Sequence, residues 1–243
     1  VRSIKVRCGE QQDDLVDRFA AKVESRGAKV LMAKDGAEAI AYILKLAAEK
    51  GAKSVAKSKS LTSEEIEVNH PMEDAGLDVV ETDLGEYIIQ LAEETPFHII
   101  APAIHKSKEE VSELFAKKID VHNLVEIEEM ARAARTKLRE RFLEADMGIT
   151  GANFLVAETG TLAIVSNEVN GRMCTSVPRV HVALTGMEKV IPCLEDLAVF
   201  LRLLPRAATG QRITSYVSLV SGPKRPGEED GPEEFHLVIV DNG

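Results

Sequence analysis

The first half of the chain alternates short β-type runs with stretches of helical periodicity, and this alternation limits the possible folds more than any other feature. Strands separated by helices pair in parallel, because the helix carries the chain back to the start of the next strand. Strands are predicted at residues 29–33, 53–57, 78–82 and 98–102. Helices are predicted at residues 36–50, from Thr62, through residues 87–92, and over residues 107–119, with capping-box spacing at Thr62–Glu65 and Ser107–Glu110.

The second half has a different pattern. Residues 125–145 are rich in Glu, Arg and Ala and predict a long amphipathic helix. Two β-runs at residues 152–157 and 161–166 flank Glu158-Thr159-Gly160, which predicts a β-hairpin with Gly160 at the turn. Further strands are predicted at residues 179–185, 214–220 and 235–240, a helix at residues 194–204 and an exposed loop at residues 222–232.

Together these elements predict an α/β protein of three layers, with a mostly parallel sheet, flanking helices and a β-hairpin in the second half. The length of 243 residues suffices for one large domain. We therefore expect a helical N-terminal lead-in over residues 1–28 and a single domain over residues 29–243.

The charge and hydropathy of the chain exclude two classes of partner. A formal net charge of -10 leaves no general basic surface for phosphates, so we expect no nucleic-acid partner. No stretch approaches the length of a membrane span, and the start at Val1-Arg2-Ser3 lacks the apolar core of a signal peptide. The expected location is the cytoplasm.

The cysteines predict neither a metal centre nor disulfides within the chain. Cys8, Cys174 and Cys193 are each isolated, and no C-x-x-C pair occurs. A four-iron cluster needs four thiolates, and a structural zinc site needs about four closely spaced ligands. We therefore expect no metal in this segment.

Four polar clusters follow predicted strands, where ligands bind in open α/β sheets. They are Lys57–Ser60, Glu81–Glu86, His105-Lys106 and Glu158–Gly160. With all strands parallel, the four clusters would face one crevice.

The first cluster predicts an anion site. Lys57 and Lys59 supply cations, and Ser60 with its free backbone N–H groups precedes a helix, so a carboxylate or phosphate could bind there. The alternative is a solvated turn in which the lysines pair with Glu64 and Glu65.

The next two clusters could exchange protons. Glu81, Asp83 and Glu86 crowd carboxylates around Thr82, which could raise one pKa enough for acid or base catalysis. Asp83 could instead be a helix N-cap. His105 could transfer a proton and Lys106 bind an anion, or the histidine could be structural.

Glu158 is the strongest candidate nucleophile or base, since a tight turn at Thr159 and Gly160 would present it to the crevice. The alternative is an exposed hairpin turn. Further polar turn residues could bind substrate or merely satisfy turns: Asn167, Asn170, Arg172, Thr209 and Gln211. The sequence has no G-x-G-x-x-G and no Walker A loop, so no standard nucleotide site is predicted.

Taken in order, these motifs resemble the LUD-domain family of the lactate-utilisation protein B. The segments that carry the resemblance are Lys57–Ser60, Glu64-Glu65, Asn69, Glu81–Glu86, Pro102–Lys106, Ala157–Gly160, Asn167-Glu168, Asn170–Arg172, Ala208–Gln211, Gly231–His236 and Asp241–Gly243. Val169 departs from the glycine that the family tends to have there.

The resemblance implies a fold like that of the ribose-5-phosphate isomerase and CoA-transferase group. It also implies membership in a three-protein system that oxidises L-lactate to pyruvate, with the other lactate-utilisation subunits as partners. Full-length members would carry two 4Fe-4S clusters beyond this segment.

Three functions follow as hypotheses. The first is the non-cluster part of an iron–sulfur oxidoreductase component, which binds a small carboxylate or phosphorylated ligand or a partner subunit and is inactive alone. The second is an autonomous isomerase or acyl-transferase-like enzyme that uses Glu158 or Glu81, with Lys57 and Lys59 holding an anionic substrate. The third is an assembly module without chemistry.

Overall fold

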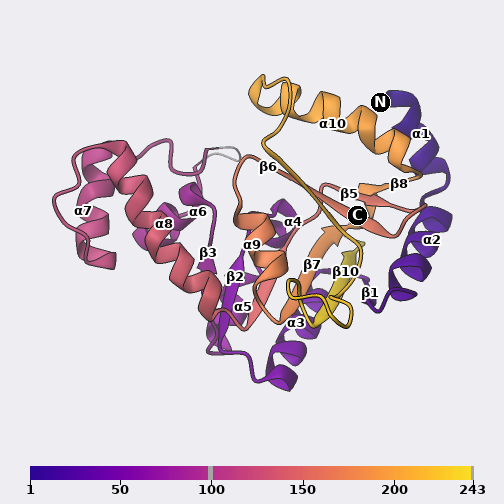
Figure 1. The fold of residues 1–243 in the computed structure, drawn as a ribbon, viewed down its shortest axis with the longest axis horizontal. Helices are drawn as coiled ribbons and strands as arrows, with labels where there is room; N and C mark the ends of the chain where they lie inside the picture. Colours follow the sequence, from indigo (N-terminus) through magenta and orange to yellow (C-terminus); the bar gives the residue numbers. More distant parts are fainter. Residues whose placement is uncertain (98–100, 242–243) are drawn as a thin grey trace.

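A sheet of parallel strands forms the centre of the fold (Figure 1). The computed structural model describes residues 1–97 and 101–241. The strand order is β1-β10-β7-β4-β2-β3, and every neighbouring pair is parallel. The bounds are β1 Lys29–Ala33, β2 Ser54–Lys57, β3 Asp78–Glu81, β4 Met147–Thr150, β7 Val180–Gly186 and β10 Glu234–Val240.

A second, mixed sheet has the order β8-β5-β6-β9. Its strands are β5 Phe154–Val156, β6 Thr161–Ser166, β8 Val190–Ile191 and β9 Tyr216–Val220. β5 and β6 pair antiparallel, and Gly160 between them has a φ of 59°, a left-handed value that glycine adopts without strain. The predicted hairpin with Gly160 at its turn is therefore confirmed.

Alternation along the strands separates the two faces of the main sheet. One face packs against α3 (Gly36–Lys50) and α5 (Asn69–Asp74), through residues such as Val55, Val79 and Met147. The β2–β3 side of the other face packs against α6 (Leu84–Ala92), α7 (Lys108–Ile119), α8 (Ile127–Glu144) and α9 (Asn170–Ser176). The predicted three-layer α/β architecture is confirmed.

The rest of that second face is covered by the mixed sheet together with α1 (Arg2–Glu10), α2 (Gln12–Glu24) and α10 (Leu194–Thr209). Leu15 and Phe19 of α2 are fully buried in the same core cluster as Leu155 and Leu237. Residues 1–28 are thus largely helical, and their buried apolar side chains belong to the same core cluster as residues of both sheets. In Figure 1 these helices lie on the side of the molecule away from α7 and α8.

Several predicted elements match their observed bounds, among them the strand at residues 29–33 and the helix at residues 36–50. The capping box at Ser107 and Glu110 is present at the start of α7. The box expected at Thr62 is wrong: the helix α4 (Leu61–Glu65) begins one residue earlier, and the Ser60 side chain caps it. The loop at residues 222–232 contains neither helix nor strand.

The predicted fourth strand at residues 98–102 falls partly outside the described residues, which omit 98–100. Within it, Ala101 has no regular structure and Pro102 lies in a turn. Among the described residues, the next strand after β3 is β4, which lies on the far side of β2 from β3. Within residues 1–97 and 101–241, no helix has both the length and the apolar character that a membrane crossing requires.

Candidate functional site

The site centres on a buried ion pair between the last residues of β2 and β3. Lys57 and Glu81 are register partners in these parallel neighbours, so their side chains leave the same face of the sheet. The Lys57 Nζ lies 2.6 Å from the Glu81 Oε1, and the two side chains are only 2% and 7% exposed. Each residue therefore neutralises the other away from water.

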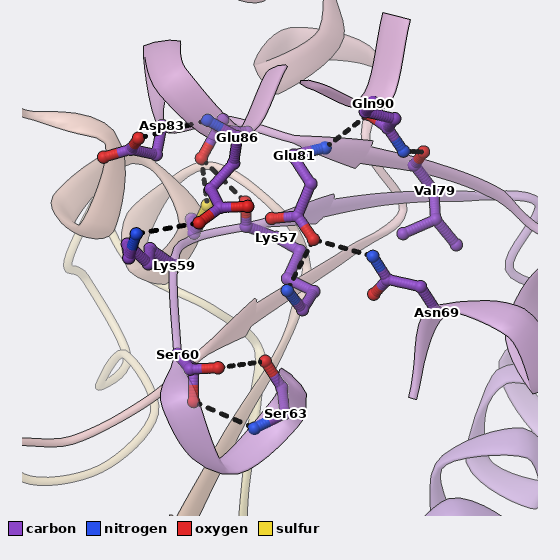
Figure 2. Close-up of polar contacts among 12 residues, drawn as sticks. Lys57, Lys59, Ser60, Ser63, Asn69, Val79, Glu81, Asp83, Glu86 and Gln90 are labelled. Carbon is purple, nitrogen blue, oxygen red and sulfur yellow. Dashed lines mark hydrogen bonds and ion pairs between the residues drawn. The ribbon is translucent and has the colours of Figure 1, made fainter. Parts of the chain in front are cut away.

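Further hydrogen bonds fix Glu81 in place (Figure 2). The Asn69 Nδ2, at the start of α5, donates to the Glu81 Oε1 over 2.7 Å. The Gln90 side chain on α6 accepts from the Glu81 backbone N–H and donates to the Val79 carbonyl. The other carboxylate oxygen of Glu81, Oε2, is buried and accepts no hydrogen bond from any described residue.

A second ion pair lies beside the first. The Lys59 Nζ is 2.8 Å from the Glu86 Oε1 in the first turn of α6. Asp83 is the N-cap of α6 and accepts hydrogen bonds from the backbone N–H groups of Gly85 and Glu86. Its contacts are those of the helix N-cap that the sequence offered as an alternative. Thr82 donates to the Lys57 carbonyl. With both lysines paired to carboxylates, the predicted anion site has no free cation among these residues.

Lys57, Glu81 and Glu86 line a cavity of about 670 Å³. The lining comes from α4, α5, α6 and the ends of β2 and β3, and includes Glu64, Asn69, Glu81, Glu86 and Gln90. This volume lies within the range of small-molecule sites. Burial, with the Glu86 charge nearby, raises the pKa of Glu64. The site is therefore a polar cavity rich in carboxylates.

Glu168, after β6, approaches the same edge of the sheet. Its carboxylate lies near the Leu84 backbone N–H and the side chains of Asp83 and Lys59. Removal of water and repulsion by Asp83 raise the pKa of Glu168 to about 7. Because part of this residue is exposed, solvent screening keeps the energetic effect small.

The raised pKa predicts how Glu168 affects stability. Its pKa of about 7 in the folded chain exceeds the ordinary 4.5, so between these values the folded state binds more protons than the unfolded state. The contribution of Glu168 to the free energy of unfolding therefore falls as pH rises from 4.5 to about 7. Relative to wild type, the Glu168→Gln variant should gain free energy of unfolding as pH rises through the window and then level off. Urea titrations from about pH 4 to about pH 8 measure this; a difference independent of pH would contradict it.

His105 and Lys106 lie next to the cavity without joining the ion pairs. The His105 Nε2 is 2.9 Å from the Glu94 Oε2, and Lys106 pairs with the other oxygen of Glu94. Glu94 itself lines the cavity. The structure therefore brings His105 close to the cavity's border but places no contact between it and Glu81.

Three of the polar turn residues of the second half, Asn167, Thr209 and Gln211, form a hydrogen-bonded group of their own. The Asn167 Nδ2 donates to the Gln211 Oε1 over 2.8 Å, and Thr209 donates to the same oxygen. Asn170 is buried at the start of α9 and accepts from the Gly171 N–H, while Arg172 is exposed. These contacts satisfy local backbone and side-chain groups, the alternative given for them from sequence.

Glu158, Thr159 and Gly160 do not share the crevice, which corrects the prediction of a common rim. The Glu158 Oε2 accepts from the Leu194 backbone N–H at the start of α10. Gly160 lies against Lys22 and Val23 of α2. Figure 1 places β5, α2 and α10 on the side of the molecule away from β2 and β3. The cause is that residues 154–156 belong to the second sheet and not to the main one.

The cysteines do not fit an iron–sulfur cluster. The sequence has three of them, fewer than the four thiolates of a four-iron cluster, and Cys8 and Cys174 are buried in different core clusters. Burial raises the pKa of the Cys174 thiol to about 12, which opposes the thiolate form that binds metal. No group of three or more His, Cys, Asp or Glu side chains could hold a metal ion within the described ranges.

Asn69, Gln90 and Glu64 were not predicted as site residues. Gln90 is four residues after Glu86 on α6 and shares its helix face, a spacing that could have suggested it. Asn69 is among the residues that carry the family resemblance, but its contact with Glu81 depends on the tertiary structure, because α5 must dock on the sheet before the amide reaches Glu81. Glu64 makes no ion pair with Lys57 or Lys59, contrary to the solvated-turn alternative.

The fold and site define a class: α/β proteins whose parallel sheet carries a polar cavity at the carboxyl ends of its strands. The family model of the LUD domain matches residues 16–240, so this chain belongs to the LUD-domain family.

Curated relatives agree with this family. The "Lactate utilization protein B" of Bacillus licheniformis is 46% identical over 235 residues, which is 96% of this chain and 49% of that protein. The Bacillus pumilus protein of the same name is 50% identical over 232 residues, or 95% of this chain and 49% of that protein. An Escherichia coli relative, "Uncharacterized electron transport protein YkgF", is 46% identical over 231 residues, covering 95% of this chain and 49% of that protein. This chain thus spans about half the length of these relatives.

A solved structure supports the fold alone. A DUF162 family protein from Deinococcus radiodurans superposes with a TM-score of 0.53 at 12% sequence identity. The match covers 94% of this chain and 98% of the other.

Proposed function

We propose that this chain is the LUD portion of an iron–sulfur oxidoreductase component that takes part in the oxidation of L-lactate to pyruvate, in the cytoplasm and with other lactate-utilisation subunits. The observation that carries this proposal is 46% to 50% identity, over nearly the whole chain, to proteins named lactate utilization protein B. The name of the Escherichia coli relative, an electron transport protein, agrees with it. In this proposal the 4Fe-4S clusters belong to the longer protein and not to the residues of this chain.

Within that protein, the domain would bind a small ligand in the cavity at the ends of β2 and β3. Support comes from the position of the cavity at the carboxyl ends of parallel strands and from its volume of about 670 Å³. Buried ionisable groups such as Lys57 and Glu81 are costly, and proteins concentrate them at functional sites.

A second candidate is an autonomous acid–base enzyme, and one observation favours it. The Glu81 Oε2 lies beside the cavity and accepts no hydrogen bond from the described residues, as a carboxylate that accepts a substrate proton would. Glu158 has no comparable support, because its carboxylate contacts the start of α10. An autonomous enzyme would convert its substrate without other subunits, whereas a component of an oxidoreductase would be inactive without them.

Growth on lactate tests the first candidate. Deleting the gene for the longer protein should abolish growth on L-lactate as the carbon source and leave growth on glucose unchanged. The wild-type full-length protein should restore growth, and after anaerobic purification it should contain iron and acid-labile sulfide. Unimpaired growth of the deletion strain on L-lactate would overturn the proposal.

The Glu64→Gln variant of the full-length protein then separates ligand binding from assembly. Slower growth on lactate with an intact complex of subunits would indicate a role in ligand binding or chemistry. Loss of the complex alone would indicate an assembly module. An exposed control, Glu10→Gln, should grow like wild type because Glu10 belongs to α1, and Figure 1 places α1 on the side of the molecule away from β2, β3 and α6.

A further inference from the structure

Three buried oxygen atoms beside the cavity lack a hydrogen-bond donor among the described residues. The Glu64 Oε1, the Asn69 Oδ1 and the Glu81 Oε2 each accept no hydrogen bond from any described residue. All three residues line the same cavity. A buried acceptor without a donor costs free energy, and three at one place call for a common donor.

The orientation of Asn69 is fixed by its neighbour. The Asn69 Nδ2 donates to a carboxylate oxygen of Glu81, which can only accept while it is paired with Lys57. Turning the amide over would place two acceptors against each other. The Asn69 Oδ1 is therefore an acceptor, and all three free atoms require hydrogen-bond donors.

The charged side chains near these oxygen atoms also favour a ligand that donates hydrogen bonds. Glu81 is paired with Lys57 and Glu86 with Lys59, while Glu64 has no ion-pair partner among the described residues. Two lysines against three glutamates leave one uncompensated carboxylate. Burial, and after it the negative charge of Glu86, raises the pKa of Glu64.

The apolar residues of the cavity lining and its volume limit the kind of ligand that could bind. Val68 and Ile89 are apolar and buried and line the same cavity. A cavity of about 670 Å³ accommodates a small molecule with an apolar part. An anion would meet the excess carboxylate, and both nearby lysines are already paired.

We propose that this cavity binds a small organic cation, with an ammonium group donating hydrogen bonds to Glu64, Asn69 and Glu81 and an apolar part against Val68 and Ile89. One positive charge would balance the excess carboxylate among Lys57, Lys59, Glu64, Glu81 and Glu86. Hydrogen bonds between an ammonium group and a carboxylate are also stronger than those between neutral groups. This inference rests on the proposed function in one respect, that this cavity is the ligand site. The sequence predicted a small anion as the ligand, and the structure favours a cation in its place.

The test compares two probes of similar size and opposite charge. n-Butylammonium and n-butyrate are titrated into the purified chain at constant ionic strength and followed by ligand-observed NMR. Butylammonium should bind with a dissociation constant in the millimolar range, as expected for so small a ligand, and butyrate should not bind. Affinity for butylammonium should fall at acidic pH, where Glu64 becomes protonated.

Variants locate the binding. Glu64→Gln keeps both ion pairs and should weaken butylammonium binding about tenfold or more, because a charge-assisted hydrogen bond is lost. The Glu10→Gln control should bind like wild type. Absence of butylammonium binding, binding unaffected by Glu64→Gln, or preferential binding of butyrate would each overturn the inference. These outcomes leave the lactate role to be judged by growth, so the two proposals fail separately.

Discussion

Replacing Lys57 with methionine is expected to lower the free energy of unfolding by about 3–5 kcal/mol, because it leaves the Glu81 carboxylate buried without its counter-charge. The loss arises from desolvation of an unpaired ion and far exceeds the value of a surface ion pair. Urea denaturation followed by circular dichroism measures it.

Two further variants make this test specific. Replacing both Lys57 and Glu81 with methionine should recover most of the stability, since an apolar pair of similar volume has no buried charge. The exposed pair of Lys45 and Glu49 provides the control, and Lys45→Met should change stability by less than about 0.5 kcal/mol. A single Lys57→Met variant as stable as the control would show that the pair does not behave as a buried ion pair.

Replacing Gly148 with alanine is expected to destabilise the chain by about 3 kcal/mol or more. A Cβ at Gly148 in β4 would overlap the carbonyl oxygen of Cys174 and lie 2.9 Å from its carbonyl carbon. The obstacle is backbone of α9, which cannot rotate away as a side-chain end can. The thermal unfolding midpoint should therefore fall sharply.

A glycine elsewhere in the chain gives the matched control. Gly9 lies in α1, and apart from its chain neighbours and the backbone of its own helix nothing lies within 4 Å of an added Cβ. Gly9→Ala should raise stability by about 0.5–1 kcal/mol, since alanine loses less backbone entropy in a helix. Equal effects at the two sites would mean that close packing of α9 on β4 is not what requires Gly148.

The elements predicted well are those whose signal is local. Periodic apolar residues and an Asp35 cap define α3, and the turn glycine Gly160 defines the hairpin. The strand β4 was missed because its four residues include Gly148, which weakens the β signal and is needed for the approach of α9. The helix α9 was missed because its opening Asn170-Gly171 is typical of a turn.

The site was predicted only in part because its chemistry depends on pairing. Sequence placed Lys57 and Glu81 at adjacent strand ends, but their shared register, which makes them neutralise each other, belongs to the sheet. The same residues therefore suggested an anion site where the structure has a closed ion pair. The prediction that Glu158 lies at the rim required all strands to be parallel, whereas β5, which precedes it, pairs antiparallel with β6 in the second sheet.

The position of β10 affects how the chain can fold during synthesis. β10 lies between β1 and β7, and it is the strand with which the edge strand β1 pairs. On the ribosome, the backbone of β1 therefore has no partner until residues 234–240 have emerged. The nascent chain therefore holds an open β edge while the residues between β1 and β10 are translated, the kind of exposed surface that chaperones protect from aggregation.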